Sequence, residues 1–278
     1  MTYSVLIFVQ DSDLYLDRAL ESLFAMPPAG LEVIAVNAGS LDASELVLTE
    51  WAAREQRVRV INLARCSEAE ALNSAALQAR GRWLGFMHAR TSFRPDAWQR
   101  LTTAVDERVE VVLTGNRLPT GPMSVQQAIA TRPRGWNCWV TSAFLRAHGL
   151  TFNSAQLAGD LGFPMWAILK AAKIVGLSPL IDGNPAAPLE LTADELLAAF
   201  AEFMRERPEL AGPLAQAALH EFDALTPPAP GPARVQWEVN RLRARAEVML
   251  LRNGLGPWGS RVAKAALRML KEGSATGH

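Results

Sequence analysis

The sequence predicts an α/β fold in which helices cover both faces of a doubly wound, mostly parallel sheet. Short apolar runs alternate with longer helical segments from residue 3 to residue 114, and this alternation is typical of βαβ units. Crossovers between parallel strands are right-handed, which makes such a sheet doubly wound. The composition agrees with a globular protein, since 49% of the 278 residues are hydrophobic and 20% are charged.

Apolar runs and turn residues place the elements of the first half. The run Val5–Val9 predicts a buried first strand, and Asp11-Ser12-Asp13 forms a turn that can cap the next helix. Two prolines and a glycine between residues 26 and 30 end that helix. The expected strands cover residues 3–10, 31–36, 57–63, 83–87 and 109–114, and the expected helices cover 14–24, 42–54, 68–80 and 93–107.

The second half is less regular. Residues 118–127 are rich in Gly and Pro and predict a loop, and 136–140 is a short apolar stretch before a helix over 142–148. Asp160 precedes a helix expected over 164–172, because Pro164 suits a first helical turn. Residues 173–181 follow as a last strand or extended segment.

The character of the chain changes after Pro188. We therefore expect two parts, an α/β domain over residues 1–190 and a helical C-terminal extension over 191–278. Within the extension, a stiff Pro-rich linker is expected at 226–232. Helices are expected at 192–205, 210–222, 234–252 and 258–271.

Charge is unevenly distributed along the chain. The formal net charge is zero, but residues 233–272 hold nine basic and three acidic residues, a net charge of +6. Such a segment favours an anionic membrane surface or an acidic protein partner, although a solvated helical face explains the charges equally well. Nucleic acid is not expected as a partner, because the whole chain is neutral and lacks interleaved basic and aromatic residues.

The two cysteines predict a reducing compartment, and the N-terminal run does not predict a signal peptide. Cys66 and Cys138 are far apart in sequence and form neither a disulfide framework nor a metal-ligand spacing. The run Val5–Val9 is too short for a signal peptide, and no apolar run reaches about 18 residues. We expect a cytoplasmic protein, with peripheral attachment to the inner face of the plasma membrane left open.

The stretch Arg82–Ser92 predicts a ligand site. Trp83–Met87 predicts a buried parallel strand, so His88, Ala89 and Arg90 stand at its carboxyl end. Ligands of open α/β sheets bind outside the carboxyl ends of the strands. Two side chains that can carry positive charge are therefore expected at the site.

The order of several motifs resembles the family 2 glycosyltransferases, which have the GT-A nucleotide-sugar-binding fold. The resemblance covers about residues 3 to 185 and implies a GT-A-like domain at 1–190. The family's strand ending in Pro-Val-Tyr-Asn aligns with Ser4 to Asp11, and its Val-Asp-Asp-Gly-Ser-x-Asp segment aligns with Val36-Asn37-Ala38-Gly39-Ser40-Leu41-Asp42. Its Ala-Arg-Asn-x-Gly helix aligns with Ala71-Leu72-Asn73, and its Phe-x-Asp-x-Asp-Asp strand end aligns with Phe86 to Thr91. Its later Gly-x-x-Phe element aligns with Gly149 to Phe152, and its Glu-Asp element aligns with Gly159-Asp160.

The resemblance implies site residues and also a departure. Donor-binding positions are Asp11, Asn37, Ala38, Asn73, His88 and Arg90. In the family, an Asp-x-Asp motif carries a divalent cation against the donor pyrophosphate, and His88-Ala89-Arg90 stands in its place. Mg²⁺ and Mn²⁺ prefer oxygen ligands, and Arg has no lone pair to offer. No metal site and no cofactor are expected.

Two functions remain open at this point. The first is an inverting transfer of sugar from a nucleotide-sugar donor to a hydroxyl of a cell-envelope glycan or lipid-linked acceptor. Arg90 would then hold phosphate, and Asp160 would be the general base by resemblance, although a plain helix cap also explains Asp160. The alternative is a catalytically inactive GT-A-like protein that binds or scaffolds.

Three tryptophans are further candidates for residues of the ligand site. Trp136, Trp139 and Trp166 can line a sugar-acceptor cleft, but core packing is the commoner place for such residues.

Overall fold

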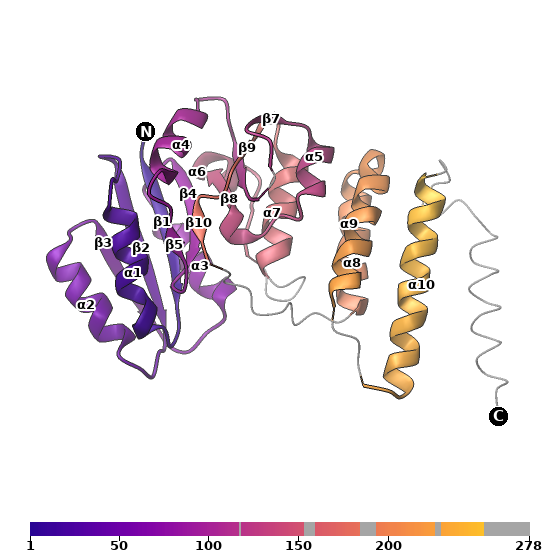
Figure 1. Cartoon of the computed structure of the whole chain (residues 1–278), viewed down its shortest axis with the longest axis horizontal. Helices are drawn as coiled ribbons and strands as arrows, with labels where there is room; N and C mark the ends of the chain where they lie inside the picture. The colour runs from indigo at the N-terminus through magenta and orange to yellow at the C-terminus, as the bar shows by residue number, and fades with distance from the viewer. Residues whose placement is uncertain (117, 153–158, 184–192, 226–228, 253–278) are drawn as a thin grey trace. The chain divides into compact units, whose positions relative to one another are not determined.

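The computed structural model describes residues 1–116, 118–152, 159–183, 193–225 and 229–252 (Figure 1). The chain divides into two compact units, residues 1–189 and residues 190–278. Among the described residues, no helix is both long and apolar enough to cross a membrane.

The first unit is built on a sheet of eight described strands in the order β3-β2-β1-β4-β8-β6-β9-β7. Neighbours from β3 to β4 are parallel, and so are β6 and β9, whereas β8 and β7 are antiparallel to the strands they pair with. The mostly parallel sheet is therefore confirmed. Its strands are β1 (Tyr3–Val9), β2 (Leu31–Ala38), β3 (Val58–Leu63), β4 (Trp83–His88), β6 (Val111–Thr114), β7 (Gly121–Met123), β8 (Cys138–Thr141) and β9 (Ile174–Leu177).

Helices connect these strands, and a second, two-stranded sheet pairs β5 with β10. The elements of this group are α1 (Asp13–Phe24), α2 (Ser44–Arg54), α3 (Glu68–Gln78), α4 (Ala97–Ala104), α5 (Val125–Ala130), η1 (Gly135–Asn137), α6 (Ser142–Ala147), α7 (Gly159–Lys170), β5 (Ser92–Phe93) and β10 (Ile181–Asp182).

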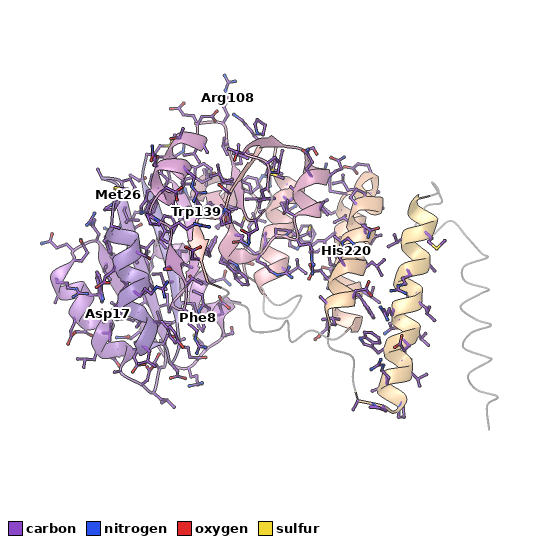
Figure 2. All side chains as sticks on the ribbon, in the orientation of Figure 1. Phe8, Asp17, Met26, Arg108, Trp139 and His220 are labelled. Carbon is purple, nitrogen blue, oxygen red and sulfur yellow. The ribbon has the colours of Figure 1, made fainter. Side chains whose placement is uncertain are left out.

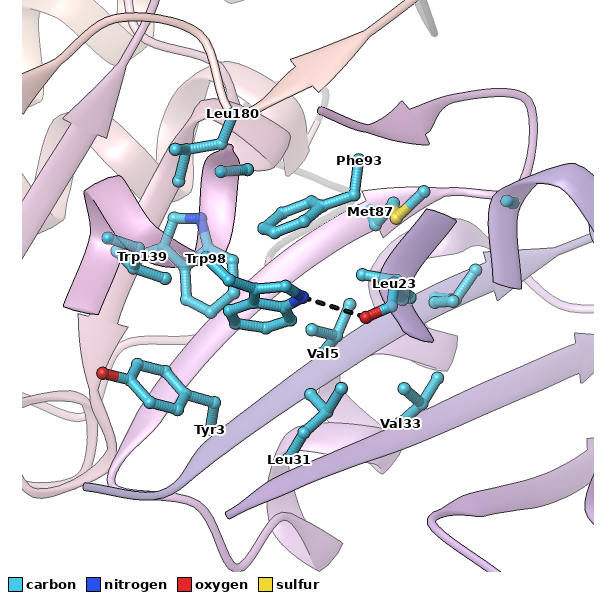
Figure 3. Close-up of a cluster of buried hydrophobic side chains, with 14 of the residues drawn as sticks. Tyr3, Val5, Leu23, Leu31, Val33, Met87, Phe93, Trp98, Trp139 and Leu180 are labelled. Carbon is cyan, nitrogen blue, oxygen red and sulfur yellow. Dashed lines mark hydrogen bonds between the residues drawn. The ribbon is translucent and has the colours of Figure 1, made fainter. Parts of the chain in front are cut away.

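One face of the sheet holds a large buried cluster under α1, α2 and α4 (Figure 3). Odd-numbered residues of β1 and β2, such as Val5 and Val33, belong to this cluster because side chains alternate along a strand. Trp98 packs edge-on against Tyr3 and donates its indole N–H to the Leu23 carbonyl at 2.9 Å. Trp139 is also part of the cluster, so core packing is its role (Figure 2).

The opposite face is covered by α3, which contacts β1 and β2. Phe86 of β4 points to this side, where it meets Phe152 and Phe163 with ring centroids 4.7 and 5.0 Å away. Phe163 lies on α7, so β4 carries apolar side chains on both of its faces. This is the burial that a continuous apolar run such as Trp83–Met87 predicts.

A half-buried carboxylate, that of Glu32, connects strands at the amino edge of the sheet. Glu32 accepts hydrogen bonds from the Ser4 hydroxyl at 2.5 Å and from the Arg80 and Gly81 amides at 2.6 and 3.2 Å. Burial raises the pKa of Glu32, but these hydrogen bonds and the charge of Arg59 outweigh it and lower the pKa below its usual value. The carboxylate therefore ties β1, β2 and the turn before β4 together.

Two expectations for this unit were wrong, and one feature of it was not expected. Residues 118–127 are not simply a loop, because they contain β7 and the start of α5, which the capping box of Ser124 and Gln127 begins. Helix α7 begins at Gly159, so Pro164 lies inside it and Asp160 in its first turn. The short β5–β10 pair was not expected.

The second unit contains α8 (Ala193–Glu206), η2 (Pro208–Leu210), α9 (Ala211–Ala224) and α10 (Pro232–Arg252). Phe222 of α9 packs on Trp237 of α10 at 5.4 Å, and both side chains are buried. Helix α10 begins at the last residue of the expected linker 226–232. The expected helix at 258–271 lies outside the described residues.

Candidate functional site

The carboxyl ends of β1, β2, β3 and β4 form one edge of the sheet. The expected site residues that end or directly follow these strands lie along it, whereas Asn73 lies on α3 and Asp160 on α7. His88 is the last residue of β4 and lies on the α3 side, where it lines a small pocket with Glu68 and Trp136. Burial, and secondarily the charge of Arg90, lower the pKa of His88. Its imidazole is therefore neutral at pH 7 and accepts a hydrogen bond at Nδ1 from the Arg90 amide, at 3.3 Å.

Arg90 lies on the other side of the strand end. Its guanidinium lies over the ring of Tyr15 on α1, 5.5 Å from the ring centroid. Both side chains are exposed. The cationic group is thus held at the end of β4 by a cation–π contact and stays exposed to solvent. No sequence motif indicated that Tyr15 would be the neighbour of Arg90.

Asp11 follows β1 in a left-handed conformation, with φ of 46°. Its carboxylate accepts a hydrogen bond from the Leu41 amide at 2.7 Å and pairs with Arg65 at 3.4 Å. Asp11 therefore bridges the loops that follow β2 and β3. Arg65 brings a further positive charge to this edge, and sequence motifs did not point to it.

The end of β2 is well packed. Asn37 is buried. Its side-chain Nδ2 donates to Oδ1 of Asn62 at 3.1 Å, and its side-chain Oδ1 accepts from the Ser40 backbone amide at 3.1 Å. Ala38 is buried, and its backbone carbonyl accepts a hydrogen bond from Gln10 at 3.0 Å. Asn37 thus shapes the turn that leads away from β2.

Asn73 of α3 has both ends of its carboxamide engaged by one residue. Its Nδ2 donates to the Phe152 carbonyl at 2.6 Å, and its Oδ1 accepts from the Phe152 amide at 2.9 Å. The side chain joins α3 to a segment 79 residues further along the chain. In this structure Asn73 positions Phe152, and its contact with a donor stays a prediction.

Asp160 lies in the first turn of α7, where a negative charge is favoured by the helix dipole. The placement of its side chain lies outside the part of the chain that the structure describes. Pro164 has no N–H to donate to the Asp160 carbonyl, four residues earlier. The structure therefore places Asp160, the general base that the resemblance implies, in the first turn of α7, and its catalytic role stays a prediction.

The pocket at His88 has a volume of about 30 Å³, which is room for about one water molecule. Glu68, the first residue of α3, is an exposed residue as a whole, but burial of its carboxyl group at the pocket removes water from it and raises its pKa. Trp136 also lines this pocket, but a space for about one water molecule is no sugar-acceptor cleft, so that role of Trp136 stays a prediction. Glu68 was not singled out from the sequence, although the capping box at Ser67 and Glu70 marked where α3 begins.

The groups at the end of β4 do not fit the divalent cation that the GT-A fold implies. Arg90 cannot coordinate a cation, and His88 offers one neutral nitrogen where hard cations need oxygen ligands. Within the described residues, no group of three His, Cys, Asp or Glu side chains could hold a metal ion.

Comparison with known proteins now identifies the family. The family model for glycosyl transferase family 2 matches residues 4–171, more than half of the chain. The chain belongs to glycosyl transferase family 2. The family 2 match includes β1 to β4, their carboxyl edge and helix α7.

Two curated relatives come from Bacillus subtilis. The uncharacterized glycosyltransferase EpsJ is 27% identical over 196 residues, and EpsH, also named a glycosyltransferase, is 33% identical over 182 residues. These matches cover 62% and 57% of this chain. The chain spans only 57% and 51% of the lengths of these relatives.

Solved structures confirm the GT-A-like fold. Residues 1–349 of S. aureus TarS superpose with a TM-score of 0.61 at 18% identity, over 91% of this chain and 92% of that one. A mannosyltransferase from Pyrobaculum calidifontis, solved with GDP-Man and Mn²⁺, superposes with a TM-score of 0.60 at 17% identity, over 98% of this chain and 79% of that one. TarS has also been solved with UDP-GlcNAc.

Proposed function

We propose that this family 2 chain is a glycosyltransferase that moves a sugar from a nucleotide-sugar donor to a hydroxyl group of a glycan or lipid-linked acceptor of the cell envelope. The observation that carries the proposal is the family 2 match over the sheet and its carboxyl edge. Structural neighbours solved with UDP-GlcNAc and with GDP-Man support a nucleotide-sugar as the donor class.

The donor would bind along the carboxyl edge of β1, β2 and β4, where Asp11, Asn37, Ala38 and His88 lie. Arg90 would hold the pyrophosphate, because a guanidinium forms bidentate hydrogen bonds to phosphate oxygens. One such hydrogen bond to a charged group contributes about 1.5–3 kcal/mol. A divalent metal stabilises the charge that develops in the transition state by several kcal/mol. A metal-free enzyme that relies on Arg90 is therefore expected to be slow unless other cations, such as Arg65, also contact the leaving group.

Asp160 would act as the general base of an inverting single displacement. Its carboxylate would take the proton of the acceptor hydroxyl while that oxygen bonds to the anomeric carbon. The bond from the anomeric carbon to the phosphate oxygen breaks, and the nucleoside diphosphate leaves with the electron pair. Asp160→Asn is expected to abolish turnover and to leave donor affinity within about twofold of wild type. Unchanged turnover would remove Asp160 from this role.

A second candidate is a catalytically inactive protein that binds or scaffolds, and the replacement of the Asp-x-Asp motif by His88-Ala89-Arg90 favours it. Calorimetric titration with UDP, GDP, CDP and dTDP, each with Mn²⁺ and with EDTA, separates the two. Binding that survives EDTA and is lost in Arg90→Ala supports the transferase. The matched control is Arg18→Ala, which removes an exposed arginine elsewhere on the first unit. No binding to any of the nucleotides would favour the inactive protein.

The basic C-terminal region would contact an anionic membrane surface. On α10, Val235, Leu242 and Met249 recur every seven residues and are 59%, 57% and 65% exposed. Residues 234–252 hold five arginines and two glutamates. An exposed apolar stripe on a positively charged helix suits the surface of a membrane that contains anionic lipid.

Flotation with vesicles of phosphatidylcholine alone or with added phosphatidylglycerol tests this contact. Binding is expected only to the anionic vesicles and is expected to fall in Leu242→Asp. The control is Leu77→Asp, which changes an apolar side chain that is exposed on α3. If this variant binds the anionic vesicles as well as wild type does, the fall in Leu242→Asp is specific to α10. Absence of binding to both kinds of vesicle would refute the membrane contact.

A further inference from the structure

The turn that carries Arg90 is short and closely hydrogen-bonded. The Thr91 amide donates to the His88 carbonyl at 3.0 Å, and the Thr91 hydroxyl donates to the same carbonyl at 2.7 Å. Thr91 is buried, whereas Arg90 is exposed. The turn therefore places one long cationic side chain at the surface, and the position of its guanidinium depends on how firmly the backbone of the turn is held.

The chain that follows this turn is held both by α1 and by β10. The Phe93 amide of β5 donates to the Ser22 hydroxyl of α1 at 2.8 Å. Strand β5 also pairs with β10, and the pairing continues where the Arg94 amide donates to the Leu180 carbonyl at 2.8 Å. An ion pair between Arg94 and Asp182 joins the same two segments at 3.3 Å. The end of β10 is thus tied to the turn that carries Arg90, although the two are far apart in the sequence.

Gly183 follows β10 and lies against the backbone of this turn. A Cβ added at Gly183 would lie 3.3 Å from the Arg90 carbonyl oxygen and 3.4 Å from Cα of Thr91. The first distance is tighter than nearly all Cβ contacts in proteins, so the carbonyl would have to shift by a few tenths of an ångström. Gly183 also has φ of 105°, outside the regions that residues with a Cβ readily adopt. Both observations favour glycine at this position.

The ring of Tyr15 offers a way to observe where Arg90 lies. The guanidinium is 5.5 Å from the centroid of that ring, and groups over the face of an aromatic ring resonate upfield because of the ring current. A displacement of the turn would move the side chain of Arg90 away from the ring. The resonances of this side chain therefore report its position without any bound ligand.

We propose that Gly183 is a positioning residue for Arg90. Its lack of a side chain lets the end of β10 close against the backbone of Arg90 and Thr91, and this contact sets the place from which the guanidinium reaches the donor pyrophosphate. The contact with pyrophosphate rests on the proposed function, whereas the hold of Gly183 on the turn does not.

NMR of the full chain with isotopically labelled arginine tests this hold in Gly183→Val and in the milder Gly183→Ala. The Arg90 side-chain resonances, assigned by their loss in Arg90→Lys, are expected upfield of those of other exposed arginines. Tyr15→Leu gives the values that Arg90 has without the ring. Both Gly183 variants are expected to move the Arg90 resonances toward these values, and valine is expected to move them further than alanine.

Gly121→Val and Gly121→Ala are the matched controls. Gly121 has a similar φ of 121°, and nothing lies within 4 Å of a Cβ added there. It belongs to β7, and three strands separate it from β4. These controls impose comparable backbone strain, but they should leave the Arg90 resonances at their wild-type values. If Gly183→Val does not fold, Gly183→Ala against Gly121→Ala makes the same comparison.

Titration of the same samples in EDTA measures the consequence for the donor. Gly183→Val should weaken the binding of the nucleoside diphosphate that binds wild type by about tenfold, the size of one hydrogen bond to a charged group. The affinity for the corresponding nucleoside, which has no phosphate, should stay within about twofold of wild type. A general loosening of the site would weaken both ligands alike and would count against a role that acts through Arg90.

Three results would overturn the hold of Gly183 on the turn: unchanged Arg90 resonances in its variants, equal shifts in the Gly121 controls, or the same Arg90 resonances in wild type and Tyr15→Leu. Shifted resonances with an unchanged affinity for the nucleoside diphosphate would overturn the link to the donor. Shifted resonances in a protein that binds no nucleotide even as wild type would uphold the hold on the turn and refute the transferase.

Discussion

Truncation of Asn73 separates its structural role from the donor contact expected of it. Asn73→Ala removes the hydrogen bonds to the amide and the carbonyl of Phe152 at 2.9 and 2.6 Å. Phe152 is only 5% exposed, so water cannot easily replace them. A buried backbone group left without a partner costs about 1–3 kcal/mol. Two such groups give an expected loss of about 2–6 kcal/mol in the free energy of unfolding.

This loss is large enough to read from a melting curve. For a domain of this size each kcal/mol lowers Tm by about 2–4 °C, so a loss of about 2–6 kcal/mol means that Asn73→Ala should melt about 4–24 °C below wild type. Phe152 also stacks on Phe163 at 4.2 Å, and we expect the near-ultraviolet circular dichroism of the variant to weaken. The control is Leu77→Ala on the same helix, which trims a side chain that is 89% exposed and should melt with wild type.

Donor binding decides between the two roles. Measured well below both melting temperatures, the affinity of Asn73→Ala for the nucleotide that binds wild type should change by less than about twofold if the side chain only positions Phe152. A Tm within about 1 °C of wild type would refute the hydrogen-bond argument. An unchanged Tm together with an affinity loss above about tenfold would place Asn73 against the donor.

Three further predictions concern the sheet and its cysteines. Gly85→Ala should destabilise the first unit by about 1–3 kcal/mol or more, because the new Cβ would lie 2.5 Å from Cε2 of the buried Trp139. Glu32→Gln should lower Tm at pH 7, and this difference should shrink as pH falls through the lowered folded pKa of Glu32, since the carboxylate stabilises the fold only while it is ionised. Burial raises the pKa of both thiols, but Cys66 is partly exposed and Cys138 is fully buried, so iodoacetamide should label Cys66 and spare Cys138.

Each of these has a contrary result. Gly85→Ala with a wild-type Tm would mean that Trp139 can move aside. A Glu32→Gln difference that grows in acid would reverse the assigned sign, and Glu50→Gln, an exposed glutamate of α2, is the control for loss of charge alone. Native labelling of Cys138 at the rate of Cys66 would show that β8 opens readily.

Most of the sheet could be predicted from the sequence because its signals are local. The run Trp83–Met87 is apolar on both faces, and the structure buries it on both faces. The region 118–127 was misjudged because β7 has three residues and α5 has six, lengths at which Gly and Pro outweigh periodicity. The capping box of Ser124 and Gln127 was the signal that could have revealed α5.

The site was harder to predict because its contacts join distant parts of the chain. The residue types at positions 88 and 90 were enough to question the metal. Nothing local indicates that Arg90 would lie over Tyr15, or that Asn73 would bind Phe152. Such partners follow from strand order and helix placement, which short-range patterns do not specify.

The place of β8 between β4 and β6 has a consequence for how the protein can change over evolution. Residues 115–137 leave β6 and return as its direct neighbour β8, so the two ends of this excursion lie one strand spacing apart. Lengthening a connection whose ends already meet costs little closure entropy. The excursion also supplies most of the walls of a cavity of about 690 Å³ at the end of β6. This single insertion could therefore change in length, and with it the cavity that it lines, while β1 to β4 and their carboxyl edge stay as they are.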